Sequence, residues 1–114
     1  MSTFKVSEVI DAIEKNGYPK IKDVFIQKNP RVNILGFKYG SKITGACAIG
    51  QAALNLGVFY EDLYRGLNKI QKGFHGSLKG RIVELNDYTE MTIPEIAQQV
   101  REEFKDYLDA KIDV

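Results

Sequence analysis

The segment that decides the fold is TIPEIAQQVREEFKDYL, at residues 92–108. Thr92 followed by Glu95 is a capping box, and Pro94 suits the first turn of a helix. Apolar positions then recur at helical spacing as far as residue 108, which predicts one amphipathic helix with a buried face. That face comprises Ile93, Ile96, Ala97, Val100, Phe104, Tyr107 and Leu108.

Three further helices are expected upstream. Residues 6–13 place their apolar side chains at helical spacing, with Gly17 as a left-handed cap. A second helix covers residues 46–56, is rich in alanine and glycine, and ends at Gly57. Residues 60–71 show a leucine stripe that predicts the third.

Two segments favour strands, residues 31–39 and 81–85. Residues 21–26 are compatible with a helix or a strand, and Pro30 is expected to end this segment before the first strand. A glycine-containing basic loop is expected over residues 36–45. Antiparallel pairs are the more frequent kind. We therefore predict an α+β fold, with about four helices packed on a small antiparallel sheet.

Composition indicates a single globular domain over residues 1–114, with 44% hydrophobic and 27% charged residues. One cysteine and one histidine exclude an intramolecular disulfide and a cysteine metal cluster, and we expect neither a metal nor a cofactor. The lone thiol and the lack of an apolar leader in residues 1–11 favour a cytoplasmic protein. The uncharged residues 43–60 contain Gln51 and Asn55, so we interpret them as a buried helix and not as a membrane span.

The net charge of +1 conceals three charged segments. Residues 20–42 hold six basic residues and one acidic residue, and residues 63–83 hold five basic residues and no acidic one. Residues 84–114 hold nine acidic and three basic residues. Such segregation indicates a surface potential suited to a charged partner, although solvated faces would give the same pattern.

The glycine-rich basic stretch at residues 72–81 is the predicted ligand site. Its glycines permit close backbone approach, and its cations suit an anion. A flexible connector remains the alternative. A nearby aromatic would stack on a nucleotide-like ligand, and the polar residues at the end of the second predicted strand would contact it. The predicted ligand contacts are Lys72, Gly73, Phe74, His75, Gly76, Lys79, Arg81, Tyr39, Asn86 and Asp87.

Cys47 is a candidate nucleophile because it begins a predicted helix, where a thiol pKa falls. His75 is the only histidine and would be its base, with Asn86 or Asp87 to orient it. A buried free cysteine is more often a small hydrophobic group. An enzyme built on Cys47 is therefore the third choice of function.

Three short motifs resemble a family of small uncharacterised proteins of bacteriophages and bacteria. They are Cys47-Ala48-Ile49-Gly50, Leu85-Asn86-Asp87, and Thr92 followed by Glu95-Ile96-Ala97. The match covers the second half of the chain, which departs from the family at Tyr88 and Met91, where a more polar turn is expected. The family has no established activity, so the resemblance implies only a phage setting.

The leading expectation is a non-enzymatic binder of a small anionic, nucleotide-like ligand, such as a phage sponge for a host defence signal in the host cytoplasm. The runner-up is an inhibitor that binds a host protein through the acidic last helix. Small residues at 46–53 suit close contact with a second copy, so a homo-oligomer, most simply a dimer, is expected. Nucleic acid is not expected as a partner, because no known binding motif accompanies the basic segments.

Overall fold

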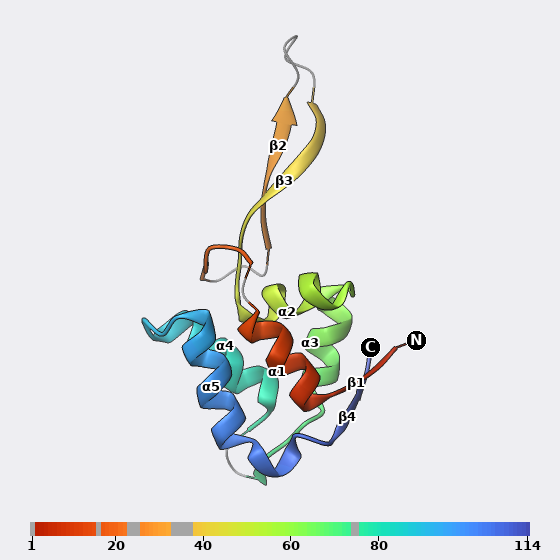
Figure 1. Cartoon of the computed structure of the whole chain (residues 1–114), viewed down its shortest axis with the longest axis vertical. Helices are drawn as coiled ribbons and strands as arrows, with labels where there is room; N and C mark the ends of the chain where they lie inside the picture. Colours follow the sequence, from red (N-terminus) through yellow and green to blue (C-terminus); the bar gives the residue numbers. More distant parts are fainter. Residues whose placement is uncertain (1, 16, 23–25, 33–37, 74–75) are drawn as a thin grey trace.

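The computed structural model describes residues 2–15, 17–22, 26–32, 38–73 and 76–114. Within these ranges it has five α-helices and two separate two-stranded antiparallel sheets, which confirms the α+β class. The molecule measures 55 × 34 × 21 Å. Its long axis follows a β-hairpin that projects from a helical body (Figure 1).

The body contains α1 Val6–Glu14, α2 Ala48–Leu56, α3 Tyr60–Asn68, α4 Leu78–Tyr88 and α5 Ile93–Glu103, followed by the short 3₁₀ helix η2 Lys105–Tyr107. In one sheet β1 Thr3–Lys5 pairs with β4 Lys111–Asp113, so the first and last strands lie together. In the other, β2 Ile26–Val32 pairs with β3 Lys38–Ala46 to form the hairpin.

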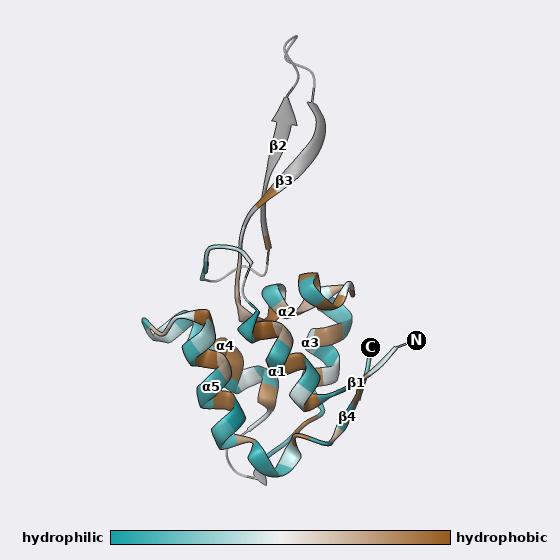
Figure 2. Cartoon of the chain, viewed as in Figure 1, coloured by the Kyte–Doolittle hydropathy of each residue, from teal (hydrophilic) through white to brown (hydrophobic). Residues whose placement is uncertain are grey.

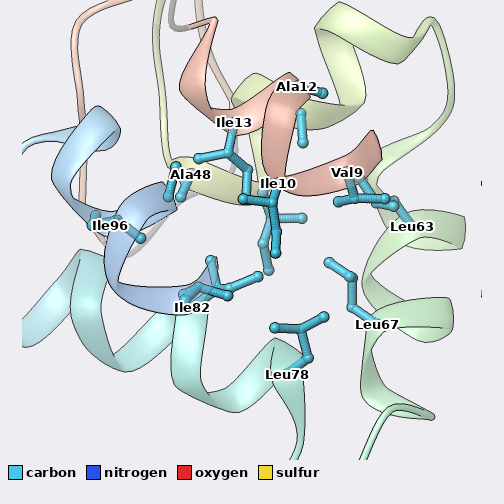
Figure 3. Close-up of a cluster of buried hydrophobic side chains, with 14 of the residues drawn as sticks. Val9, Ile10, Ala12, Ile13, Ala48, Leu63, Leu67, Leu78, Ile82 and Ile96 are labelled. Carbon is cyan, nitrogen blue, oxygen red and sulfur yellow. The ribbon is translucent and has the colours of Figure 1, made fainter. Parts of the chain in front are cut away.

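The hydrophobic core lies between the helices of the body. Side chains from all five helices meet there (Figure 3), and the helices carry both hydrophobic and hydrophilic positions (Figure 2). Ile10, Leu67, Leu78 and Ile82 are fully buried and point towards one another (Figure 3). Burying each such side chain contributes about 1.5–3 kcal/mol. The body is therefore stabilised by helix packing, and neither sheet forms a layer beneath the helices.

Local sequence signals set several helix ends as predicted. Thr92 and Glu95 form the capping box of α5, with proline in its first turn. Gly57 adopts the left-handed conformation, with φ of 71°, and ends α2. Both signals act within one turn of helix, so the local sequence predicts them without knowledge of the tertiary structure.

The strand predicted at residues 81–85 is wrong, because these residues lie within α4. Leu78, Ile82 and Leu85 are buried at a spacing of four and three residues, which is the helical period. The side chain of Ser77 accepts a hydrogen bond from the amide of Gly80 at 3.0 Å and so caps the helix. The two segments predicted as strands therefore cannot pair with each other, and β2 pairs with β3 instead.

The hairpin also differs from the predicted strand at 31–39 and loop at 36–45. β2 continues through Pro30, and β3 includes the glycines and lysines of residues 38–46. Each strand of a two-stranded ribbon has one unpaired edge, where a proline needs no N–H partner. Part of the segment predicted as a helix or a strand, residues 23–25, lies outside the described residues, but Ile26 begins β2.

Two further helix ends differ from prediction. The cap of α1 is Lys15 in the right-handed region, and Gly17 has no positive φ but donates its amide hydrogen to the side chain of Gln51. The last helix ends at Glu103, and Phe104 adopts a non-helical conformation before η2. Phe104 is nevertheless buried, so the predicted apolar face is formed by a helix and the turn that follows it.

Candidate functional site

Gln51 ties the root of the hairpin to α2. Its side chain is fully buried. The Oε1 atom accepts hydrogen bonds from the amides of Gly17 and Tyr18 at 3.0 and 3.2 Å. The Nε2 atom donates to the carbonyl oxygens of Tyr18 at 2.6 Å and Ala46 at 3.2 Å. All four hydrogen-bonding positions of the amide are used, so its burial leaves no unpaired polar atom.

Asn86 makes a second buried connection, from α4. Its Oδ1 atom accepts a hydrogen bond from the amide of Ala48 at 3.0 Å, and its Nδ2 atom donates to the carbonyl oxygen of Ile21 at 2.9 Å and to Oδ1 of Asp87 at 2.8 Å. The side chain is 2% exposed. Asn86 was predicted to contact a ligand at the end of a strand. It lies instead inside a helix and caps the N-terminus of α2.

Cys47 is the N-cap of α2 and is 6% exposed. Its Sγ atom accepts a hydrogen bond from the amide of Gly50 at 3.4 Å. Burial raises the pKa of the thiol, and the negative charge of Asp87 raises it further, although helix amides act in the opposite direction. The neutral thiol is therefore favoured, and the geometry supports a small buried group more than a nucleophile.

The three motifs of the phage-family resemblance meet in this region. Ala48 from the first motif bonds to Asn86 from the second, and Ile96 and Ala97 from the third are buried in the same core. Each motif thus has a direct role in joining α2, α4 and α5. The contacts explain why these residue types suit the fold without assigning them any chemistry.

Lys72 and Arg81, two of the predicted ligand contacts, line one cavity of about 450 Å³ with Glu84, Glu103 and Phe104. The guanidinium group of Arg81 forms two hydrogen bonds with the carboxylate of Glu103, at 2.7 and 2.8 Å, and one with Glu84 at 2.9 Å. This pairing lowers the pKa of Glu103 and raises that of Arg81. Lys72 donates to the carbonyl oxygen of Glu103. A phosphate would have to displace these partners.

Lys79, Gly73 and Gly76 are not among the described residues that line this cavity. The ammonium group of Lys79 lies 4.9 Å from the ring centroid of Tyr64. Gly73 and Gly76 have positive φ angles of 53° and 84° in the segment between α3 and α4. Tyr39 lies on β3, in the hairpin. Phe74 and His75 lie outside the described residues, so their predicted roles stay predictions.

The two basic segments lie at opposite ends of the body. The hairpin leaves one end, and the segment between α3 and α4 lies at the other (Figure 1). In the described part of the chain, the fold therefore keeps the two basic segments apart. The hairpin strands and the residues between them, 26–46, contain Lys28, Arg31, Lys38 and Lys42 and no acidic residue. The remainder of the chain carries a net charge of −3.

A second cavity, of about 390 Å³, lies at the root of the hairpin and is here called the root cavity. One side is the chain that leads into β2, and the other is the turn between α4 and α5. Lys20 donates to the carbonyl oxygens of Thr89 and Met91 at 3.2 and 2.5 Å. Lys22 pairs with Glu90 at 3.0 Å. The lining residues are Tyr18, Pro19, Lys20, Lys22, Glu90, Met91, Thr92 and Ile93.

Sequence reasoning placed the basic residues of this cavity in a charged segment but did not identify a site. The useful signal is a tyrosine and a proline directly before two lysines, followed by a hairpin. This signal does not reveal the second wall of the cavity, because the turn that faces these residues lies about 70 positions further along the chain.

The small-residue face of α2 is not available to a second copy. Ala48, Ala52 and Ala53 are buried within the chain's own body, where α2 packs against α1, α3 and α4. Self-association through this face is therefore wrong as a prediction, and a dimer formed through another surface stays a prediction. On α5, Arg101 pairs with Asp11 at 3.0 Å and with Glu14 at 2.7 Å, which neutralises part of the acidic surface.

Within the described ranges, no three histidine, cysteine, aspartate or glutamate side chains group closely enough to hold a metal ion. In those ranges no helix has the length and apolar character needed to cross a membrane. No family model, curated protein or solved structure matches the chain.

Proposed function

We propose that the protein binds nucleic acid without catalysis, and that the β2–β3 hairpin is the binding arm. The observation that carries the proposal is the separation of charge. The arm has a net charge of +4, while the rest of the chain has a net charge of −3. The strands that carry this positive charge in the sequence project from the acidic body along the long axis of the molecule (Figure 1).

A polyanion fits this arrangement better than a single small anion does. Cations spread along a strand match the regular spacing of phosphates, and their contacts release bound counterions, which drives association. Two-stranded β-ribbons are also narrow enough to follow a nucleic-acid groove. An isolated hairpin is only marginally stable in water, so a partner along the arm would stabilise it.

The proposal keeps the phosphate chemistry expected of the ligand but moves it to the arm, and it takes nucleic acid as the partner although the sequence carries no known binding motif. At residues 72–81 the guanidinium group of Arg81 already contacts Glu103 and Glu84, whereas residues 26–46 contain no acidic neighbour in sequence. Binding a phosphate beside Arg81 would break its pair with Glu103, which contributes about 1 kcal/mol or less, and would place the phosphate next to the negatively charged carboxylate of Glu103. A phosphate bound along the arm would meet no acidic residue of residues 26–46.

The test is fluorescence anisotropy with labelled oligonucleotides of about 20 nucleotides, longer than typical sites of about 4–16 nucleotides. We expect binding that weakens with salt. The plot of log Kd against log salt concentration should have a slope of about 3, since four cations each contribute about 0.7–0.9.

The paired variant Lys28→Glu and Lys42→Glu should weaken binding about 100-fold or more, because two charge-assisted contacts are reversed. The matched control, Lys69→Glu with Lys105→Glu, makes the same change in net charge on exposed residues of the body. Equal loss in both variants would show that total charge, and not the arm, controls binding. No binding of any oligonucleotide would reject the proposal.

A further inference from the structure

We propose that the root cavity is a subsite for one unpaired nucleobase, with Tyr18 as its stacking surface, so that the arm selects single-stranded over duplex nucleic acid. This inference rests on the proposed function and makes it more specific. The cavity lies directly beside the last residue of β3, because the amide of Ala46 donates to the carbonyl oxygen of Pro19 at 3.0 Å. A strand bound along the arm would therefore reach it.

The size and lining of the cavity suit a base. Its volume of about 390 Å³ falls within the range of about 300–1,000 Å³ that is usual for small-molecule sites. An aromatic ring and a proline lie on one side, and Met91 and Ile93 supply apolar surface on the other. Glu90 and Thr92 add polar groups that can bond to the edge of a base.

The backbone of Tyr18 is held in place by the core of the body. Both its amide hydrogen and its carbonyl oxygen bond to the side chain of Gln51, at 3.2 and 2.6 Å. Gln51 is fully buried in the second turn of α2, which is part of the rigid core. The residue that follows, Pro19, restricts the backbone further. A backbone that is already fixed loses less conformational entropy on binding than a mobile one, which favours affinity.

The two lysines of the cavity can hold the adjoining phosphates. Lys20 uses two of the three protons of its ammonium group on Thr89 and Met91, which fixes its position and leaves one donor. Lys22 pairs with Glu90, whose side chain is 96% exposed. An exposed pair of this kind contributes about 0–1 kcal/mol, so a phosphate can replace the glutamate at small cost.

Base pairing decides which nucleic acid can use the site. In a duplex the bases are stacked inside the helix, and placing one in a protein cavity requires unpairing and unstacking at a cost of a few kcal/mol. A single strand presents its bases without that cost, and any base has a π face to stack. The arm alone would bind either form, whereas the arm with an occupied root cavity favours the single strand.

The experiment compares fluorescein-labelled oligothymidylate and oligouridylate with a duplex of the same length. Both single strands should bind at least about tenfold more tightly than the duplex. Tyr18→Ala should weaken single-strand binding by about 5- to 100-fold and leave duplex binding unchanged, because one stacked base is lost. Tyr18→Phe, which keeps the π face, should bind as the parent does. Tyr18→Leu keeps apolar bulk without that face and should resemble Tyr18→Ala.

Tyr64→Ala is the matched control, since Tyr64 is a half-buried tyrosine on α3. It is not part of the arm and is not among the residues that line the root cavity. Photo-crosslinking of a 5-iodouracil strand should give an adduct on the peptide that contains Tyr18. Equal affinity for single strands and duplex, with parent-like binding by Tyr18→Ala and Tyr18→Leu, would overturn this inference and leave the proposed function standing. Absence of binding to all three oligonucleotides would overturn both.

Discussion

The Oδ1 atom of Asn86 accepts a hydrogen bond from the amide nitrogen of Ala48 at 3.0 Å, which joins the C-terminal part of α4 to the first turn of α2. The first amides of a helix lack partners within it, so this contact satisfies a group that would otherwise be buried unpaired. The same side chain donates to the carbonyl oxygen of Ile21, on the chain that leads into the hairpin. One amide therefore holds together two helices and the root of the arm.

Replacing this amide should destabilise the whole domain. Asn86→Ala removes the partners of the Ala48 amide and the Ile21 carbonyl, so we expect the free energy of unfolding to fall by about 2–4 kcal/mol. Urea denaturation followed by circular dichroism measures the change. Asn68→Ala is the control, because Asn68 is exposed at the end of α3 and should change stability by less than about 0.5 kcal/mol. A similar loss in both variants would contradict the role assigned to Asn86.

Val100 provides a direct test of the core. It is fully buried on α5, the helix that packs against α1 and α4. Val100→Ala should lower the free energy of unfolding by about 1–3 kcal/mol, through lost burial and the cavity left behind. Thermal melting would detect the loss, and Glu102→Ala on the exposed side of the same helix should melt close to the parent. An unchanged melting temperature for Val100→Ala would refute the packing of α5.

The sequence predicted best those features that depend on a few neighbouring residues. The capping box at Thr92 and the left-handed cap at Gly57 are complete within one turn, and both are confirmed. The strand expected at residues 81–85 failed because Ile82 and Val83 favour strands, while the start of the helix at Ser77 fell inside a segment interpreted as a loop. The helical spacing becomes visible only when Leu78 is counted as a buried residue, and its burial depends on tertiary packing.

The candidate sites were harder to predict because they depend on distant partners. Arg81 looked like a free cation, yet Glu103 neutralises it from a different helix. The root cavity lies between residues 18–22 and residues 90–93, and no local sequence pattern predicts that these two segments meet. The hairpin register is likewise a pairing across the chain. The periodicity of apolar residues predicts none of these contacts, since it describes one helix or strand at a time.

Cys47 should behave as a structural thiol. Because burial raises its pKa, iodoacetamide should modify it slowly in the folded protein at neutral pH and much faster once urea exposes it. Mass spectrometry of quenched samples gives both rates. Cys47→Ala should cost about 1 kcal/mol, through the lost cap and lost packing, and should leave oligonucleotide binding intact. Fast modification of the folded protein, together with loss of binding, would instead favour a reactive role.

The pair formed by Arg81 and Glu103 should make stability depend on pH. Arg81 holds the pKa of Glu103 below its ordinary value of about 4.3, so the folded state favours the charged carboxylate. Its contribution is therefore complete above that ordinary value and is lost as the pH falls through the lower pKa of the folded state. Side-chain exposures of 27% and 25% place the pair at the surface, where it contributes about 1 kcal/mol or less.

Glu103→Gln should accordingly reduce the free energy of unfolding by about 1 kcal/mol or less at neutral pH. The difference from the parent should shrink at low pH, as the Glu103 carboxylate of the parent becomes protonated. Urea titrations at intervals between about pH 3 and 7 would measure it, because this range brackets the glutamate pKa. Glu102→Gln removes the same charge from the exposed neighbour and should show no comparable difference at neutral pH. A difference for Glu103→Gln that stays constant over the whole range would show that shape and packing, and not the charge held by Arg81, account for the contribution of this side chain.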